Sequence, residues 1–143
     1  MDIAKFGTQK NADDGVWFEP VIFGVPMGVE FCVRGKDSDA VRKYEAEVYR
    51  ETQAMNKNER ERINWKERGI EAAARKVSGM RTKDDSPVTI GGDEIEDNSA
   101  GYKKIFRFSP EVGDAITLFA ENRANFLPQE KKGSNEPSDN SST

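Results

Sequence analysis

Between Pro26 and Pro87 the chain contains no proline, and this uninterrupted stretch constrains the fold more than any other feature of the sequence. Residues 38–79 within it are rich in helix formers, which favour an α-helix. Just before them, Asp37-Ser38 can accept hydrogen bonds from the free N–H groups of a first helical turn. The sequence therefore predicts a helical region over 38–79.

Apolar residues recur every three or four positions in the first part of this region, and they resume seven apart at Ile63, Ile70 and Val77 with a displacement of one residue. One continuous helix would be about 60 Å long. A compact domain of this size has a radius of gyration of roughly 14–15 Å. Two alternatives follow: the helix bends back near Asn56–Glu61, or the molecule is elongated and pairs with a neighbour.

The amino-terminal part has two different compositions. Residues 1–15 are mostly polar, so we expect a flexible arm. Strand-forming residues follow from Val16, and Val29, Phe31 and Val33 alternate with polar or small residues in a period of two. A glycine- and proline-containing turn separates the two runs. The sequence therefore predicts a β-hairpin over 16–34 with one apolar face.

The sequence of the carboxy-terminal part predicts a loop followed by a helix. Residues 81–101 contain glycines, and between Asp84 and Asp97 they hold six carboxylates and no basic residue, which predicts an acidic loop. We expect Tyr102–Phe108 to be a short strand or an extended lead-in. Ser109 and Pro110 then form a helix start signal, so a helix is predicted over 109–127.

Residues 129–143 contain no apolar side chain, and we expect a disordered tail over 128–143. The expected fold class is mainly α with a small N-terminal β-hairpin (α+β). Helices follow the hairpin, and a single domain covers 16–127.

The residues needed for most enzyme chemistry are missing from the sequence. There is no histidine, which excludes histidine-based catalytic triads and zinc sites, and Cys32 is the only cysteine. The acidic loop does not match the ligand spacing of a calcium-binding EF-hand. We therefore expect no enzymatic activity, no cofactor and no metal. No apolar run is long enough to span a bilayer, so we expect a cytoplasmic protein with no membrane partner.

Lys57–Arg68 is the segment most similar to a nucleic-acid contact, because five basic residues surround Trp65. Three glutamates interleave with these bases, and the whole chain carries a net charge of −4. Such interleaving is typical of a solvated helix face, so we do not expect nucleic acid as a partner.

Hydrophobic residues make up 35% of the chain, below the share of about 45–50% typical of globular domains. A small core, or one completed by another protein, would follow from this deficit. Interaction with another protein is therefore the favoured function. The candidate protein-binding residues, taken from the apolar stripes of the hairpin and helices, are Trp17, Phe18, Phe31, Val33, Val41, Tyr44, Val48, Phe119 and Phe126.

Three blocks of the sequence stand out: MDIAKFGTQKNADDGVWFE at the amino terminus, FCVRGKDSDAVRKYEAEV at the junction of hairpin and helix, and ENRANFLP near the carboxy terminus. Together they resemble the tail assembly chaperones of long-tailed (siphovirus-like) bacteriophages. The resemblance lies in their order and spacing. It extends over most of 1–128 but is poor in the acidic loop.

The resemblance implies a mainly helical, non-enzymatic protein that binds the tape measure protein and keeps this long rod soluble during tail assembly. It also implies recruitment of tail tube subunits, self-association, a location in the host cytoplasm and absence from the mature virion. Two alternatives remain open. One is a minor structural phage protein, such as a connector or tail-completion component, and the other is a small nucleic-acid-binding regulator.

Overall fold

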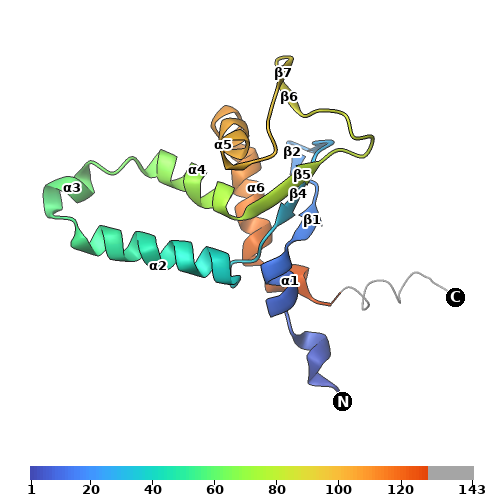
Figure 1. The fold of residues 1–143 in the computed structure, drawn as a ribbon, viewed down its shortest axis with the longest axis horizontal. Coiled ribbons are helices and arrows are strands. Elements are labelled where there is room, and N and C mark those ends of the chain that lie inside the picture. Colours follow the sequence, from blue (N-terminus) through green and yellow to red (C-terminus); the bar gives the residue numbers. More distant parts are fainter. Residues whose placement is uncertain (129–143) are drawn as a thin grey trace, which may run out of the picture.

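A small three-stranded sheet, a group of helices packed on it and a projecting helical hairpin make up the fold (Figure 1). The structure is a computed structural model that describes residues 1–128. The elements, in chain order, are η1 (Ile3–Phe6), α1 (Gln9–Asp14), β1 (Val16–Phe18), β2 (Val21–Ile22), β3 (Val25–Pro26), β4 (Glu30–Val33), α2 (Asp39–Ala54), α3 (Lys57–Glu61), α4 (Trp65–Arg75), β5 (Val77–Arg81), β6 (Thr89–Ile90), β7 (Asp93–Glu94), α5 (Ser99–Phe108), α6 (Pro110–Glu121) and η2 (Arg123–Phe126).

The predicted fold class is confirmed, because a small β-rich region near the amino terminus is followed by a mainly helical chain. The tail predicted for 128–143 lies, apart from Pro128, outside the described residues. Within the described part, no helix is both long and apolar enough to cross a membrane.

The predicted β-hairpin over 16–34 is present as the antiparallel pair β1 and β4, in which Val16 lies opposite Val33. The short β2–β3 hairpin extends from it. A third strand, β5, pairs with the other edge of β4, with Met80 opposite Phe31. The helical region predicted to reach residue 79 was therefore too long: α4 ends at Arg75, because pairing with β4 draws the following residues into the sheet.

The region over 38–75 folds into a hairpin of helices rather than one long helix. The Ser38 side chain accepts a hydrogen bond from the Val41 N–H at 3.2 Å, and α2 runs from there to Ala54. The chain turns at Asn56, which starts α3 with reciprocal side-chain caps to Glu59. Figure 1 shows α4 returning toward the sheet beside α2. The alternative of a helix that bends back near Asn56–Glu61 is confirmed.

The core lies between the inner face of the sheet and helices α4, α5 and α6. Phe31 from β4, Phe106 from α5 and Ile116 from α6 are all fully buried there. The rings of Phe31 and Phe106 lie 6.2 Å apart, within the range of a favourable aromatic pair. The alternating apolar residues of β4 therefore point into the core of this same chain.

The amino-terminal segment, expected to be a flexible arm over 1–15, instead packs on the body through α1. Ala12 is 2% exposed, and its carbonyl accepts a hydrogen bond from the Gly35 N–H at 3.0 Å. The Asn11 amide donates to the Leu127 carbonyl at 2.8 Å. A small alanine facing a glycine allows the two backbones to approach closely, a signal that the polar composition of the segment hides.

The acidic loop predicted over 81–101 contains more structure than its charge indicates. A small β6–β7 hairpin forms within it, and Ile95 is buried in the core. The Asp97 carboxylate accepts hydrogen bonds from the Met80 N–H at 3.0 Å and from the Tyr102 hydroxyl. One apolar side chain and one hydrogen-bonded carboxylate thus anchor the end of the loop.

The prediction of a strand or extended lead-in at Tyr102–Phe108 was wrong, because this segment belongs to α5. Tyr102, Ile105 and Phe106 are buried on one helical face, as their spacing of three and four allows. The C-terminal helix predicted over 109–127 is present as α6, with Pro110 in its first turn, but it ends at Glu121. The Asn122 side chain then caps the short helix η2.

Candidate protein-binding site

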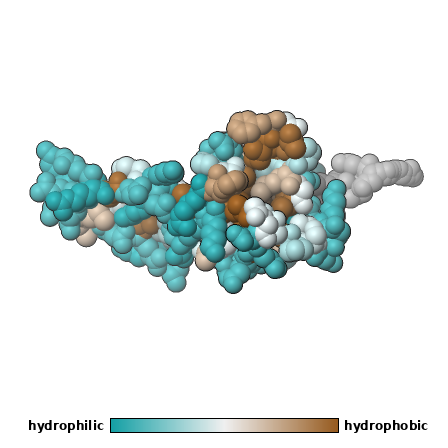
Figure 2. All heavy atoms as spheres, turned by 90° about the horizontal axis from the view of Figure 1, so that it is seen from above, coloured by the Kyte–Doolittle hydropathy of each residue, from teal (hydrophilic) through white to brown (hydrophobic). Residues whose placement is uncertain are grey.

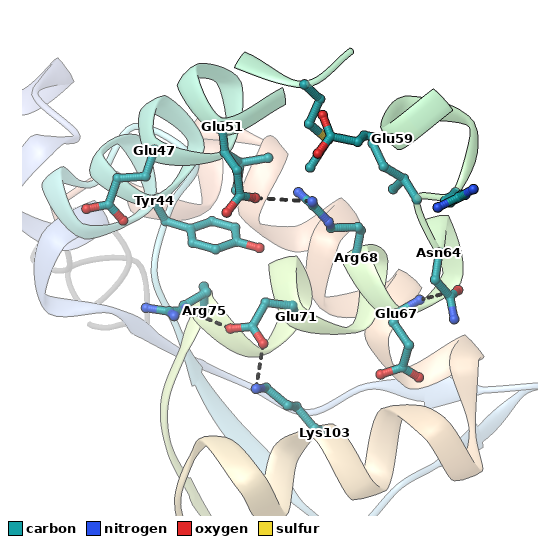
Figure 3. A pocket seen from close by; sticks show the side chains of 14 residues that line it. Tyr44, Glu47, Glu51, Glu59, Asn64, Glu67, Arg68, Glu71, Arg75 and Lys103 are labelled. Carbon is teal, nitrogen blue, oxygen red and sulfur yellow. Dashed lines mark hydrogen bonds and ion pairs between the residues drawn. The ribbon is translucent and has the colours of Figure 1, made fainter. Parts of the chain in front are cut away.

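The space between α2 and α4 forms an open groove of about 750 Å³ on the projecting helical hairpin (Figure 3). The groove is lined by side chains from α2, from the turn with α3, and from α4, with one residue from α5. These residues are Tyr44, Glu47, Val48, Glu51, Met55, Glu59, Arg62, Ile63, Asn64, Glu67, Arg68, Glu71, Arg75 and Lys103.

The groove is open because α2 makes little use of its apolar face within this chain. Val41, near the body, is the one buried residue of α2. Tyr44, Val48 and Met55 continue the same helical stripe along the groove but stay half-buried. Ile63, before α4, is also half-buried on the other side of the groove. Four sizeable apolar side chains therefore line a concave surface that their own chain does not fill.

Charged side chains of both signs lie among these apolar side chains and across the groove. Arg68 of α4 lies 3.1 Å from the Glu51 carboxylate of α2, so this ion pair joins the two helices (Figure 3). Glu71 lies 2.8 Å from Arg75 and 2.5 Å from Lys103. Burial alone would raise the pKa of Glu71, but its hydrogen bonds to Lys103 and Arg75 hold that pKa below its ordinary value. The groove therefore presents charges that are already partly neutralised.

Tyr44 lies near the body end of the groove, with the Arg75 guanidinium 4.9 Å from the centre of its ring. Burial raises the pKa of the Tyr44 hydroxyl, and the negative charge of Glu71 raises it further. The hydroxyl thus remains protonated near neutral pH, and Tyr44 offers an apolar ring with a polar edge, a combination common in protein interfaces.

The structure separates the nine predicted binding residues into interior and surface positions. Phe31, Val33, Val41 and Phe126 are each no more than 2% exposed, so they are core residues and do not form a binding surface in this fold. The prediction that the Phe31 and Val33 face is available to a partner was wrong. The physical reason is that helices α4 to α6 cover that face of the sheet.

The remaining predicted residues lie in three places. Tyr44 and Val48 line the groove. Phe18 stacks on Phe119 with ring centres 4.3 Å apart, at the edge of the core. Trp17 is 38% exposed, and the Arg81 guanidinium covers its ring at 3.8 Å. The structure therefore does not bring the nine residues together into one site.

Sequence reasoning missed the groove residues that come from the other side of the hairpin, and it missed the exposed tip of β2–β3. Phe23 in that tip is 85% exposed and has a positive φ of 51°, next to Gly24 with φ 80°. Figure 2 shows hydrophobic atoms gathered over this hairpin, whereas the α2–α4 hairpin is mainly hydrophilic. The signal for this exposed tip in the sequence was the two-residue turn Phe23-Gly24 between the β-branched residues Ile22 and Val25.

The basic segment Lys57–Arg68 is partly used within the helical hairpin. Arg60 donates to the carbonyls of Thr52 and Gln53, at 3.1 Å and 3.3 Å, and so satisfies the end of α2. Arg68 forms the ion pair with Glu51 described above. Trp65 is 66% exposed at the start of α4. Two of the five bases in this segment thus have structural roles.

Among residues 1–128 no group of three or more histidine, cysteine, aspartate or glutamate side chains is placed to hold a metal ion. What the groove offers to a partner is its concave shape and its pattern of apolar and charged side chains. In comparisons with known proteins, no family model, no characterised protein and no solved structure matches this chain.

Proposed function

We propose that this protein is a non-enzymatic tail assembly chaperone, which holds a helical segment of a phage tape measure protein in the groove between α2 and α4. The family assignment rests on the three sequence blocks that resemble such chaperones. The groove is the single structural observation that supports it: a concave surface in which four sizeable apolar side chains lie among charged ones, on a helical hairpin that projects from the body.

The groove suits an amphipathic helix as its occupant. Two neighbouring helices that leave an apolar channel between them can pack a third helix along it, and the third helix then contributes residues spaced at i, i+3, i+4 and i+7. Tyr44 and Val48 would face it from α2, and Met55 and Ile63 from the turn. Each apolar side chain that becomes fully buried contributes roughly 1.5–3 kcal/mol.

The charged side chains of the groove fit a client that must later be released. Ion pairs such as Glu51–Arg68 are already formed in the free protein, so a client helix gains little net energy by replacing them. Binding would then depend mainly on the four apolar side chains of the groove and would remain moderate. Tail tube subunits that compete for the same rod would displace the chaperone, which would act in the host cytoplasm and be absent from the mature virion.

The proposal is tested by co-expressing the full chain with the tape measure protein of the same phage and measuring how much of the rod stays in the supernatant. We expect the native chain to increase that fraction. Val48→Asp and Ile63→Asp each replace an apolar side chain of the groove by a carboxylate, and each should abolish most of the increase.

Tyr49→Asp is the matched control, because Tyr49 lies on the same helix as Val48 but is 66% exposed and does not line the groove. This variant should protect the rod as well as the native chain does. An unchanged amount of soluble rod with the native chain would contradict the proposed function. Equal loss with all three variants would place the binding site elsewhere.

A further inference from the structure

A second cavity of about 400 Å³ lies between α4, the end of α5 and the start of α6. It uses a different face of α4 from the groove described above. Apolar and small residues make up most of its wall, with four polar side chains among them. The lining residues are Trp65, Lys66, Gly69, Ile70, Ala72, Ala73, Lys76, Phe106, Pro110, Gly113, Asp114 and Thr117.

Lys76 is the unusual member of this wall. It is 6% exposed, and its ammonium donates one hydrogen bond, to the Ala72 carbonyl at 3.2 Å. An ammonium has three N–H donors, and no carboxylate lies within ion-pair distance of this one among residues 1–128. Burial lowers the pKa of Lys76, and distant Glu45 and Glu121 only partly oppose that shift. A buried charge without a counterion is costly.

Two glycines inside helices open the same cavity. A Cβ atom at Gly69 of α4 would meet no heavy atom within 4 Å, and one at Gly113 of α6 would meet its neighbours only at 3.5 Å or more. Neither glycine is therefore required by close packing, although glycine is unfavourable in the middle of a helix. Because these glycines have no side chain, they leave space in the cavity that Lys76 also lines.

We propose that this cavity binds a carboxylate carried on a flat apolar group, with the Lys76 ammonium as the partner of the carboxylate. The volume is in the range of small-ligand sites. Trp65, which is 66% exposed, supplies aromatic surface for the flat group. Asp114 also lines the cavity, and its charge disfavours a second negative group on the ligand, so the site selects a monoanion. The ligand is either a free aromatic acid or the aromatic C-terminal residue of a peptide.

A purely structural role for Lys76 accounts for less of what is observed. Lys76 is the C-cap residue of α4, where a positive charge and a donor to the last carbonyls are both favourable. That role uses one donor and needs neither the cavity nor the two glycines. A glutamine at this position keeps a donor for the Ala72 carbonyl and removes the charge, so the two roles are separable.

The test uses Trp65 fluorescence of the full chain in a Trp17→Phe background, titrated with 3-phenylpropionate and with the uncharged 3-phenylpropionamide. A second pair of probes is a short peptide ending in phenylalanine with a free carboxylate and the same peptide as its amide. We expect at least one acid to bind saturably and at least tenfold more tightly than its amide. Lys76→Gln should weaken that binding at least tenfold, and Lys76→Arg should weaken it less.

The pH dependence of binding gives a second measurement that does not require a variant. Affinity of the acid for the native chain should fall at alkaline pH as Lys76 loses its proton, while the signal of the amide stays flat. Binding of the small acid without the peptide, or the reverse, identifies the source of the ligand. Equal affinity of acid and amide, failure of both acids to bind, or unchanged binding in a folded Lys76→Gln variant would each overturn the proposal. This site is independent of the proposed chaperone function.

Discussion

Arg68 of α4 and Glu51 of α2 lie 3.1 Å apart, and this ion pair joins two helices whose facing surfaces are otherwise only half-buried. Both side chains are partly exposed, and an exposed pair of this kind contributes about 0.2–1 kcal/mol. The stability of the body therefore does not depend on it. The ion pair affects instead the local stability of the helical hairpin.

We expect the amides of α2 beyond Tyr44 to exchange with solvent much faster than those of α5, because the hairpin can open while the core stays folded. Glu51→Arg places two positive charges together and should increase exchange in α2 further, with a nearly unchanged melting temperature. Hydrogen exchange followed by mass spectrometry measures both. Protection of α2 equal to that of α5 would contradict this.

Two glycines should respond in opposite ways to alanine. A Cβ at Gly101 would lie 1.8 Å from the Glu96 carbonyl oxygen, so Gly101→Ala should lower the free energy of unfolding by at least about 2 kcal/mol. Gly69→Ala adds a methyl group in open space and should raise it by roughly 0.5–1 kcal/mol. Urea denaturation of both variants checks the pair, and a destabilised Gly69→Ala variant would show that the space around Gly69 is occupied.

Phe106 and Phe108 are two residues apart on α5 but differ completely in burial. Phe106 is 0% exposed and Phe108 is 75% exposed. Phe106→Ala should cost about 3–5 kcal/mol, a large part of the stability of a domain of this size. Phe108→Ala, the matched control, should change stability by less than about 0.5 kcal/mol. Thermal unfolding followed by circular dichroism distinguishes them, and similar losses would mean that α5 is rotated relative to the core.

The ion pair between Asp37 and Arg123 should make stability depend on acid pH. The hydrogen bond from Arg123 holds the pKa of Asp37 below its ordinary value of 3.8. A carboxylate with a lowered pKa in the folded state stabilises that state above its unfolded pKa, and the contribution is lost as the pH falls through the folded pKa. The native chain should therefore be more stable than Arg123→Gln at pH 7, and the difference should shrink progressively as the pH falls below 3.8.

The control for this comparison is Arg50→Gln, which removes an exposed guanidinium from the middle of α2. Its effect on stability should be small and should not change between pH 7 and pH 3. Urea titrations at several pH values provide the measurement. A difference for Arg123→Gln that does not shrink as the pH falls below 3.8 would show that Arg123 acts through contacts other than the Asp37 charge.

Lys76 should lower the stability of the folded chain near neutral pH and lose this effect at alkaline pH. The Asp37–Arg123 pair, by contrast, raises stability near neutral pH and loses its effect at acid pH. Burial lowers the pKa of Lys76 from the ordinary 10.5, so at pH values below the folded-state pKa both folded and unfolded chains are protonated and the folded chain carries the full cost of the buried charge. Lys76→Met should therefore be more stable than the native chain near pH 7. The advantage should shrink as the pH rises toward 10.5, because the folded native chain loses the proton. An advantage independent of pH would contradict this, and Lys66→Met is the exposed control.

The sequence by itself determined the amphipathic segments and several of their ends. Ser38 caps α2 and Pro110 starts α6 where local chemistry predicts. The absence of histidine and of a second cysteine is likewise fixed by the chain alone, whatever its fold. These features could be predicted because caps, turns and helical periodicity depend on residues within a few positions of one another.

Only the tertiary structure decided which apolar residues are core and which form surfaces. Phe31 is buried whereas Phe23 is 85% exposed, although both belong to the same apolar region of the sequence. The strand at Val77–Arg81 exists because β4 needs a partner on its second edge. The groove exists because α2 meets the core only near Val41. Burial of each side chain is set by contacts between segments far apart in the chain, and those contacts leave no periodic signal in the sequence around any one residue.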